Sequence, residues 1–164
     1  MTKGYRPNVG MMIINADKKV LMCTRLYSEG QPYRLQMPQG GIDKGERPTQ
    51  AVYREMHEEI GLKPADVRFV ASTRKWYKYD LPESARKKRS IRGQRQKWFL
   101  FLLACPDTHI DLNMYKIKEF SDFQWVDFEQ VPELVIPFKR EVYQNVLNEF
   151  RPFVERLKTG TTVP

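Results

Sequence analysis

The chain has few cysteines and histidines, which are the residues of disulfide scaffolds and of soft metal sites. Its two cysteines, Cys23 and Cys105, each lie in an apolar stretch, VLMCTR and FLLACP. This setting predicts buried free thiols rather than a disulfide, and a reducing, cytoplasmic compartment. The two histidines lack the spacing of metal ligands. We expect His57 on the core side of a helix and His109 in a loop, and we assign neither a role.

Long apolar runs are also absent. None approaches the ~20 residues that span a bilayer, and MTKGYRPN at the N-terminus lacks the apolar region of a signal peptide. No repeat, low-complexity tract or linker divides the chain. With 164 residues, 41% apolar and 29% charged, the sequence predicts one soluble globular domain over residues 1–158 and a frayed tail at 159–164. A membrane partner is not expected.

The net charge of +8 is concentrated in one segment. Residues 74–97 contain ten lysines and arginines against Asp80 and Glu83, so this segment supplies the whole net charge. A single basic segment on an otherwise neutral domain indicates an anionic partner, and polyphosphate or nucleic acid is the first candidate. The alternative is a solvated charged surface.

Hydrophobic periodicity predicts a mixed β-sheet with helices on its two faces, an α/β fold. Gln96–Cys105 is apolar enough for a central strand buried on both faces. Residues 82–93 are expected to form a charged loop, and Gln39-Gly40-Gly41 a turn. Pro152 is expected to kink or end the last helix. The other expected strands and helices are Val9–Ile14, Lys19–Arg25, Leu35–Met37, Val67–Thr73, Trp76–Leu81 and Phe120–Val126 as strands, and Pro48–Ile60, a turn at Phe128–Leu134 and a helix from Phe138.

The expected helix Pro48–Ile60 carries three acids at positions i, i+3 and i+4. At these spacings Glu55, Glu58 and Glu59 share one face, with Cβ atoms roughly 5–6 Å apart. Three carboxylates this close repel one another, and Arg54 is the only adjacent counter-charge. An oxygen-lined face of this kind favours a hard divalent cation such as Mg²⁺ or Mn²⁺. The alternative is a solvated acidic helix face.

Residues 40–62, GGIDKGERPTQAVYREMHEEIGL, fit the pattern G-x5-E-x7-R-E-U-x-E-E-x-G-U, where U is aliphatic. Seven fixed identities make a chance match on the order of one in 10⁸ per start position. The pattern resembles the box of the Nudix hydrolases, which cleave nucleoside diphosphates linked to another moiety. The resemblance implies a single Nudix domain, an α/β/α sandwich with a mixed sheet, and metal-dependent attack of water on a diphosphate linkage.

Five further segments resemble one subgroup of this family, which removes pyrophosphate from the 5′ end of triphosphorylated or diphosphorylated RNA and so promotes mRNA decay. They are GYRPNVG (4–10), MPQGGI (37–42), ASTRKWYKY (71–79), GQRQKWF (93–99) and FKREVY (138–143). The alternative activity is hydrolysis of diadenosine polyphosphates of the Ap4A or Ap5A type. A third reading is a binding module without catalysis, which loss of a box carboxylate would indicate; none is lost.

The resemblance assigns roles to the box residues. It implies that Glu55, Glu58 and Glu59, with the main chain of Gly40, hold Mg²⁺ or Mn²⁺, with more than one ion when substrate is bound. Arg54 is expected to orient the acids. The general base is left open between Glu58, our first choice, and Glu119. Glu46 fits either an outer carboxylate of the metal site or a loop anchor.

The resemblance also assigns residues to the substrate. Arg6 and Phe138 match positions that stack on a terminal base, although Phe138 also fits a core aromatic residue. Three tryptophans, Trp76, Trp98 and Trp125, are expected in the core rather than under a base. No stable protein partner can be deduced. The remaining predicted substrate contacts, mainly to phosphates, are Arg25, Tyr79, Arg95, Lys97 and Lys139.

Overall fold

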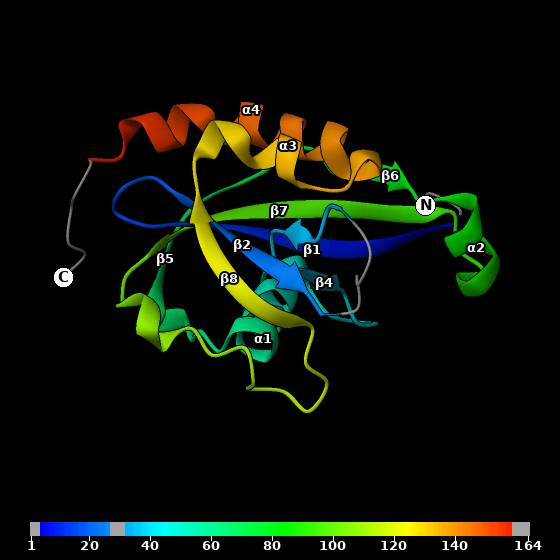
Figure 1. The fold of residues 1–164 in the computed structure, drawn as a ribbon, viewed down its shortest axis with the longest axis horizontal. Coiled ribbons are helices and arrows are strands. Elements are labelled where there is room, and N and C mark those ends of the chain that lie inside the picture. Colours follow the sequence, from blue (N-terminus) through cyan, green and yellow to red (C-terminus); the bar gives the residue numbers. More distant parts are fainter. Residues whose placement is uncertain (1–3, 27–31, 159–164) are drawn as a thin grey trace.

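In the computed structural model, a mixed eight-stranded sheet lies between helices (Figure 1). The structure describes residues 4–26 and 32–158, and for residues 87–89 it describes the main chain only. The predicted tail 159–164 lies outside the described residues. The strands are β1 (Tyr5–Ile14), β2 (Val20–Arg25), β3 (Leu35–Gln36), β4 (Gln39–Gly41), β5 (Val67–Ser72), β6 (Tyr77–Asp80), β7 (Gly93–Leu103) and β8 (Phe120–Val126). The helices are α1 (Pro48–Ile60), α2 (Glu83–Arg89), α3 (Val131–Leu134) and α4 (Arg140–Arg156), with short 3₁₀ turns η1 (Pro64–Asp66), η2 (Asp107–His109), η3 (Phe128–Gln130) and η4 (Pro137–Lys139).

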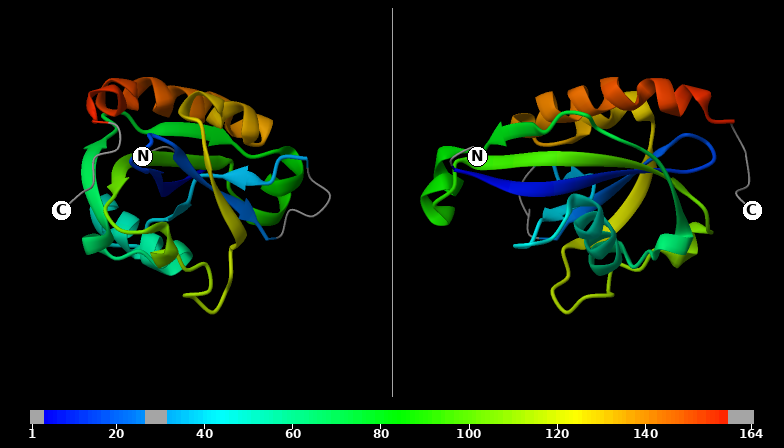
Figure 2. Two further views of the ribbon diagram at one scale, coloured as in Figure 1. Left: turned by 60° about the vertical axis from the view of Figure 1, so that its left-hand side comes forward. Right: turned by 180° about the vertical axis from the view of Figure 1, so that it is seen from behind.

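The two long strands β1 and β7 pair in parallel along their length, from Tyr5 opposite Gly93 to Ile14 opposite Leu102. The other strand pairs are antiparallel, and the order across the sheet is β3-β2-β1-β7-β5. Helices α3 and α4 cover one face and α1 covers the other, which is visible from two further sides (Figure 2). The predicted α/β/α sandwich with a mixed sheet is confirmed.

Alternation of side chains along the central strands produces two apolar cores. Met12 and Ile14 of β1 pack with α4, and Met11 and Ile13 pack with α1. This follows from the period of two in a strand, which sends successive side chains to opposite faces. The predicted central strand Gln96–Cys105 is confirmed as buried on both faces from Trp98 to Leu102. The strand β7 itself begins earlier, at Gly93, and ends at Leu103, before the half-buried Cys105.

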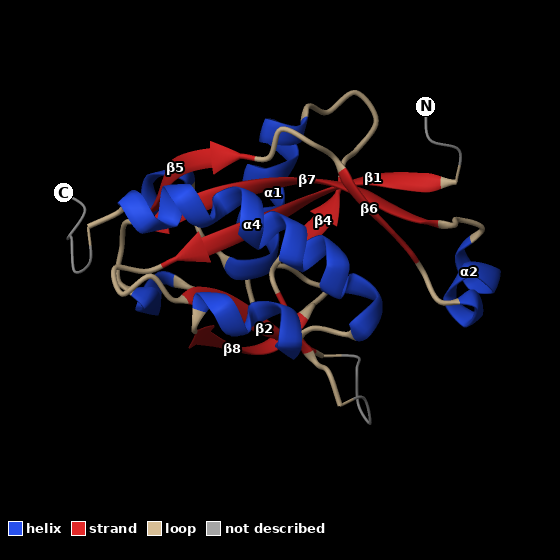
Figure 3. Ribbon diagram, turned by 90° about the horizontal axis from the view of Figure 1, so that it is seen from above, coloured by secondary structure: helices blue, strands red, loops and turns tan. Residues whose placement is uncertain are grey.

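Three predictions about local structure are wrong. Residues 82–93 are not all loop, because Glu83–Arg89 form α2, which projects beyond the end of β6 (Figure 3). Lysine and arginine are good helix formers, so a charge run does not exclude a helix. The predicted turn at Gln39-Gly40-Gly41 is strand β4, and β1 begins at Tyr5 rather than Val9 because its polar first half pairs with β4 and β7.

Pro152 lies inside α4 without ending it. The residue is exposed, so the carbonyl that loses its partner to proline remains accessible to water. Both cysteines are free, as predicted. Cys23 is buried, but Cys105 is only half-buried, so the predicted burial of Cys105 is wrong because β7 ends before it, at Leu103. Trp98 is in the core, but Trp76 is 38% exposed, so the prediction that it is a core residue is wrong. Among the described residues, no helix has the length and apolar character needed to cross a membrane.

Candidate active site

A cleft of about 580 Å³ opens between the acidic face of α1 and the start of α4. Strands β1 and β4 and the segment before β8 contribute residues to its lining. Of the predicted site residues, it gathers the three box acids with Gly40, Glu119, Arg6, Arg25, Tyr79, Phe138 and Lys139. Residues far apart in the sequence therefore meet in one concave surface of the size that ligand sites have.

Helix α1 holds the three acids toward the cleft because its apolar stripe is buried against the sheet. The buried arc is Ala51, Val52, Met56 and Ile60. The helix ends at Gly61, whose left-handed φ of 72° suits glycine. The three acids are less exposed than acids on an ordinary surface helix: Glu55 is buried, and Glu58 and Glu59 are half-buried. His57 is exposed, so its predicted place on the core side is wrong: it lies 100° beyond Met56, off the buried arc.

Arg54 joins the acids of α1 to the loop that precedes the helix. Its Nε lies 2.8 Å from Glu46 Oε2, and its Nη1 lies 2.9 Å from Glu55 Oε1 and 3.3 Å from Glu58 Oε2. Its Nη2 donates to the Gly41 carbonyl at 2.8 Å. Glu46 also accepts from the Asp43 amide at 3.0 Å, so it anchors this loop. The hydrogen bonds from Arg54 lower the pKa of Glu46 to about 2. The guanidinium thereby fixes the carboxylates in place before any ligand arrives.

The acid cluster has the features of a divalent cation site. A Cβ added at Gly40 would lie 2.0 Å from the carboxyl carbon of Glu55, so only glycine admits this carboxylate against the β4 main chain. Glu59 Oε2 is buried and, among the described residues, finds no hydrogen-bond partner. Burial raises the pKa of Glu59 well above its ordinary value, and the charges of Glu55 and Glu119 raise it further. A buried oxygen without a partner among like charges fits a hard cation, which supplies the missing positive charge.

Glu55 shares this environment. Burial raises the pKa of its carboxyl, against the opposing effect of Arg54. Glu58 is less enclosed, with a side chain 29% exposed toward the cleft. Glu119 is exposed and precedes β8, on the wall that faces Glu59. The two predicted candidates for the general base therefore come from different elements, α1 and the segment before β8.

The opposite end of the cleft is aromatic and cationic. The Tyr79 hydroxyl donates to Gln94 Oε1 at 2.8 Å, and the ring centroids of Tyr79 and Phe138 are 5.7 Å apart. Phe138 is half-buried against the core and also lines the cleft, so it contributes to the core, and its stacking on a base stays a prediction. Lys139 is 5% exposed, and its Nζ donates to Gln36 Oε1 at 3.1 Å. A cation held this firmly is preorganised for an anionic ligand.

Two predicted substrate residues, Arg95 and Lys97, do not line this cleft. Side chains alternate along β7, so these two share one face while Gln94 and Gln96 share the other. Arg95 instead lies with its guanidinium carbon 4.5 Å from the Trp76 ring centroid. Their contact with substrate stays a prediction, and it would require substrate outside the cleft.

Comparison with known proteins agrees with this geometry. Residues 4–146 match the family model of the NUDIX domain. The chain belongs to this family. A protein of Francisella tularensis subsp. mediasiatica named RNA pyrophosphohydrolase is 45% identical over 153 residues, which are 92% of this chain and 96% of that protein. One of the same name from Sodalis glossinidius is 46% identical over 163 residues, covering 94% of this chain and 88% of that protein.

The fold of this NUDIX protein is shared by solved structures of much lower sequence identity. The crystal structure of a C. elegans Ap4A hydrolase binary complex superimposes with a TM-score of 0.70 at 19% identity, covering 92% of this chain and 98% of that chain. Identity at this level supports the NUDIX fold and no finer assignment.

Several residues of this NUDIX cleft were missed by sequence reasoning. Gln39 and Gln94 lie within the segments MPQGGI and GQRQKWF, which carry the family resemblance, so a signal for them existed. Tyr115 and Ile117 line the cleft from the segment before Glu119 and are 51% and 63% exposed. No periodic pattern marks this segment, so nothing in the sequence placed these two side chains beside the acids.

Gly40→Ala is expected to weaken binding of the divalent cation on the order of 10–100-fold, as loss of a group that orients a ligand does. The added Cβ would collide with the Glu55 carboxylate and push it out of the cluster. The metal concentration for half-maximal activity measures this effect. Gly45→Ala is not a suitable control because its φ of 82° is left-handed. Ser72→Ala is a suitable control, because Ser72 does not line the cleft. An equal rise in the half-maximal metal concentration of that variant would contradict a collision at Gly40 as the cause.

The metal requirement of the enzyme is expected to rise as pH falls. The raised pKa values of Glu55 and Glu59 mean that these carboxyls keep their protons to higher pH than free glutamate does. Metal binds the deprotonated form, so its affinity is full above the raised values and is lost as pH falls through them. Glu46 stays ionised throughout, since its pKa is about 2. The test measures the Mg²⁺ concentration that gives half-maximal activity, at several pH values from alkaline to mildly acidic. If this concentration did not change with pH, the prediction would be contradicted.

Proposed function

We propose that this protein is an RNA pyrophosphohydrolase, which hydrolyses a phosphoanhydride bond at the 5′ end of triphosphorylated or diphosphorylated RNA and leaves a 5′-monophosphate. The observation that carries the proposal is one continuous cleft. Its acidic end suits a metal-bound diphosphate, and its other end offers aromatic rings and cations for the first nucleotides. The name of the two relatives that are 45% and 46% identical to it supports the same substrate.

The ion we propose is Mg²⁺ or Mn²⁺, with more than one ion when substrate is bound. Glu55, Glu58, Glu59 and the main chain of Gly40 would hold it. When bound, the metal neutralises the diphosphate oxygens and lowers the pKa of a coordinated water. Carboxylate oxygens suit these hard ions, whereas the cleft offers them no imidazole or thiolate among the described residues.

The chain's own residues bind and orient the substrate. Arg25 and Lys139 line the cleft, and we assign them to the phosphates, whose charge they would neutralise. Arg6 lies against Gly41, where an added Cβ would come within 2.6 Å of its Nη2. Phe138 lines the same cleft, and we propose that a base stacks on its ring and on the Arg6 guanidinium.

Proton removal from the attacking water falls to a carboxylate of the acid cluster itself or of the segment that faces it. We propose Glu58 as this general base, with Glu119 as the second candidate. Arg54 lies 3.3 Å from Glu58 Oε2 and keeps that carboxylate oriented while its other oxygen remains available. The attacking water adds to phosphorus, the phosphoanhydride bond breaks, and the proton passes to the carboxylate.

A second hollow favours RNA over a dinucleotide. It has a volume of about 370 Å³ and adjoins the cleft, because Tyr79 and Phe138 line both. Lys78, from the basic segment 74–97, lines the second hollow and not the first. Asp80 and Glu141 line the same hollow, and Asp80 is paired with Arg86 and Arg92. A substrate that extends past the aromatic pair would therefore place its next phosphate against Lys78.

The test compares kcat/KM for a short triphosphorylated RNA and for diadenosine tetraphosphate at equal Mg²⁺. RNA is expected to be the better substrate, with a steep dependence of KM on salt because bound phosphates release counterions. Preferential hydrolysis of the dinucleotide would instead support the alternative activity. If the metal-bound protein hydrolysed neither substrate, the result would support the reading of the protein as a binding module without catalysis.

Lys78→Ala is expected to reduce the slope of log KM for RNA against log salt by about one, as loss of one phosphate contact does. Hydrolysis of diadenosine tetraphosphate should be unchanged. Lys75→Ala is the matched control, because Lys75 is an exposed lysine of the same segment outside both hollows. Equal effects of the two substitutions would mean that only the overall charge of the segment matters.

We further propose that residues 1–158 act as a single catalytic domain. Removal of the 5′ pyrophosphate exposes transcripts to decay, so the cytoplasm is the location consistent with this activity. The chemistry as described needs no stable protein partner.

A further inference from the structure

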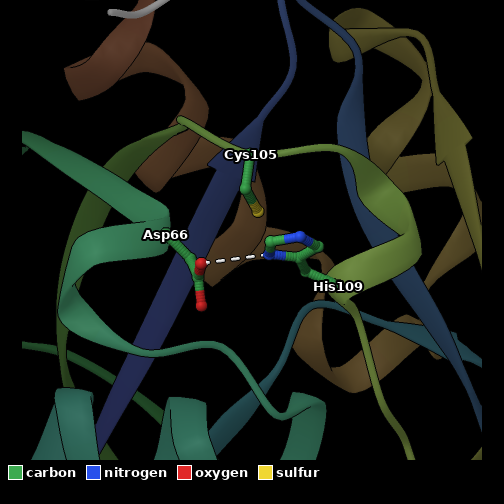
Figure 4. A group of neighbouring side chains, drawn as sticks. All are labelled: Asp66, Cys105 and His109. Atoms are coloured by element: carbon green, nitrogen blue, oxygen red, sulfur yellow. Dashed lines mark hydrogen bonds and ion pairs between the residues drawn. The ribbon is translucent and has the colours of Figure 1, made fainter.

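Asp66, Cys105 and His109 converge outside the catalytic cleft, where η1 meets the connection between β7 and β8 (Figure 4). Each offers one ligand atom, and the three atoms lie within 4.8 Å of one another. Asp66 Oδ1 and His109 Nδ1 are 3.2 Å apart. The Cys105 side chain points toward the gap between these two groups.

The main chain holds this cluster in place. The Ala104 amide donates to the Asp66 carbonyl at 2.7 Å, which ties the residue before Cys105 to Asp66. The second carboxylate oxygen of Asp66 accepts from the Lys63 amide at 2.8 Å, so Oδ1 is left to face His109. The His109 amide donates to the Pro106 carbonyl at 3.0 Å and closes η2. Hydrogen bonds that fix a ligand's orientation in this way accompany protein metal sites.

We infer that Asp66, Cys105 and His109 form a second metal site, which takes Zn²⁺ or a similar borderline transition ion and not the Mg²⁺ or Mn²⁺ of the catalytic cleft. One thiolate, one imidazole and one carboxylate are a zinc ligand set, whereas hard ions prefer oxygen alone. Zinc bonds of about 2.0–2.3 Å place tetrahedral ligand atoms roughly 3.3–3.8 Å apart. The oxygen–nitrogen distance is already near this value, and rotation of the side chains can close the remaining gaps.

The fourth position of the tetrahedron would be taken by water. The His109 side chain is 52% exposed, so solvent and the ion can reach the cluster. Three protein ligands and one open position are the arrangement of an accessible zinc site rather than a closed structural one.

The competing reading is a simple ion pair between Asp66 and His109, to which Cys105 is incidental. Burial and the neighbouring Asp66 raise the pKa of the Cys105 thiol to about 11, so without metal it is not a reactive thiolate. Metal binding would displace its proton and would therefore strengthen with pH. The ion pair has no need of sulfur, so an experiment that detects sulfur coordination separates the two readings.

The experiment titrates the chelator-treated full chain with Co²⁺ alone and records the near-ultraviolet thiolate-to-cobalt charge-transfer band. The catalytic cleft cannot give this band, because no cysteine lines it among the described residues. We expect the band at one equivalent of Co²⁺ and its loss on addition of Zn²⁺. It should persist in Cys23→Ala, vanish in Cys105→Ser, and require at least a tenfold higher Co²⁺ concentration in His109→Ala.

Hydrolysis with Mg²⁺ should be unchanged in Cys105→Ser and His109→Ala, which also shows that these variants are folded. Absence of the band in the folded wild-type protein, or its persistence in Cys105→Ser, would overturn the proposal. Because the readout is spectroscopic, its outcome is independent of whether RNA is the substrate of the catalytic cleft.

Discussion

Glu58→Gln is expected to lower kcat on triphosphorylated RNA by at least ~10³-fold while the protein remains folded. A general base contributes about 10²–10⁴-fold, and loss of a metal-binding carboxylate adds to that. Glutamine has the same shape and can still accept a hydrogen bond from Arg54 Nη1, which now lies 3.3 Å from Glu58 Oε2. The helix and its salt-bridged loop should therefore persist. Single-turnover kinetics at saturating Mg²⁺, with circular dichroism as the check on folding, measure the effect.

Glu119→Gln is the matched comparison, because it removes the other candidate base from the opposite wall. If Glu58 is the base, the Glu119 variant should lose less activity at saturating Mg²⁺. The reverse order, with unaltered metal dependence in the Glu119 variant, would transfer the role to Glu119. A Glu58→Gln enzyme that retains most of its activity with normal metal dependence would overturn the assignment of Glu58 to the site.

The acidic side of the site was predictable from sequence because it is local. Helical spacing places Glu55, Glu58 and Glu59 on one face whatever the rest of the chain does, and Gly61 marks the helix end. The central strands were predictable for a similar reason: continuous apolar runs such as FLFLL can only be buried. The depth at which the acids are buried could not be predicted, because it depends on the position of β4, whose Gly40 lies against the Glu55 carboxylate.

The substrate side was harder because it is built from strand register. Arg95 and Lys97 looked equivalent to other cations of the basic segment, yet alternation along β7 turns them away from Gln94. Whether Arg6 or Arg95 faces the cleft depends on the pairing of β1 with β7 and β4, which the sequence does not state. Tyr115 and Ile117 reach the cleft from an irregular segment, where no periodicity reports direction.

Glu59→Gln should have opposite effects on activity and stability. Glu59 is half-buried beside Glu55, and its buried Oε2 has no hydrogen-bond partner among the described residues. Its raised pKa favours the protonated form, whose stabilising contribution is present below the ordinary glutamate pKa near 4.5 and is lost as pH rises through the raised value. Ionisation of Glu59 without metal therefore costs the folded protein stability, and glutamine removes that cost.

We expect the metal-free Glu59→Gln variant to be more stable than wild type, because glutamine places no charge in a site whose burial and neighbouring carboxylates disfavour one. In a chain of this size each kcal/mol raises Tm by roughly 2–4 °C. Hydrolysis should fall at least ~10²-fold, because a metal ligand is lost. Melting curves recorded with chelator across neutral and acidic pH measure the stability, and the melting temperature of the variant should depend less on pH.

Glu155→Gln is the control, because Glu155 is an exposed glutamate of α4, and this substitution should change neither stability nor activity. A Glu59→Gln protein no more stable than wild type would mean that the cluster tolerates its charge without metal, which would remove the physical argument for a cation at Glu59.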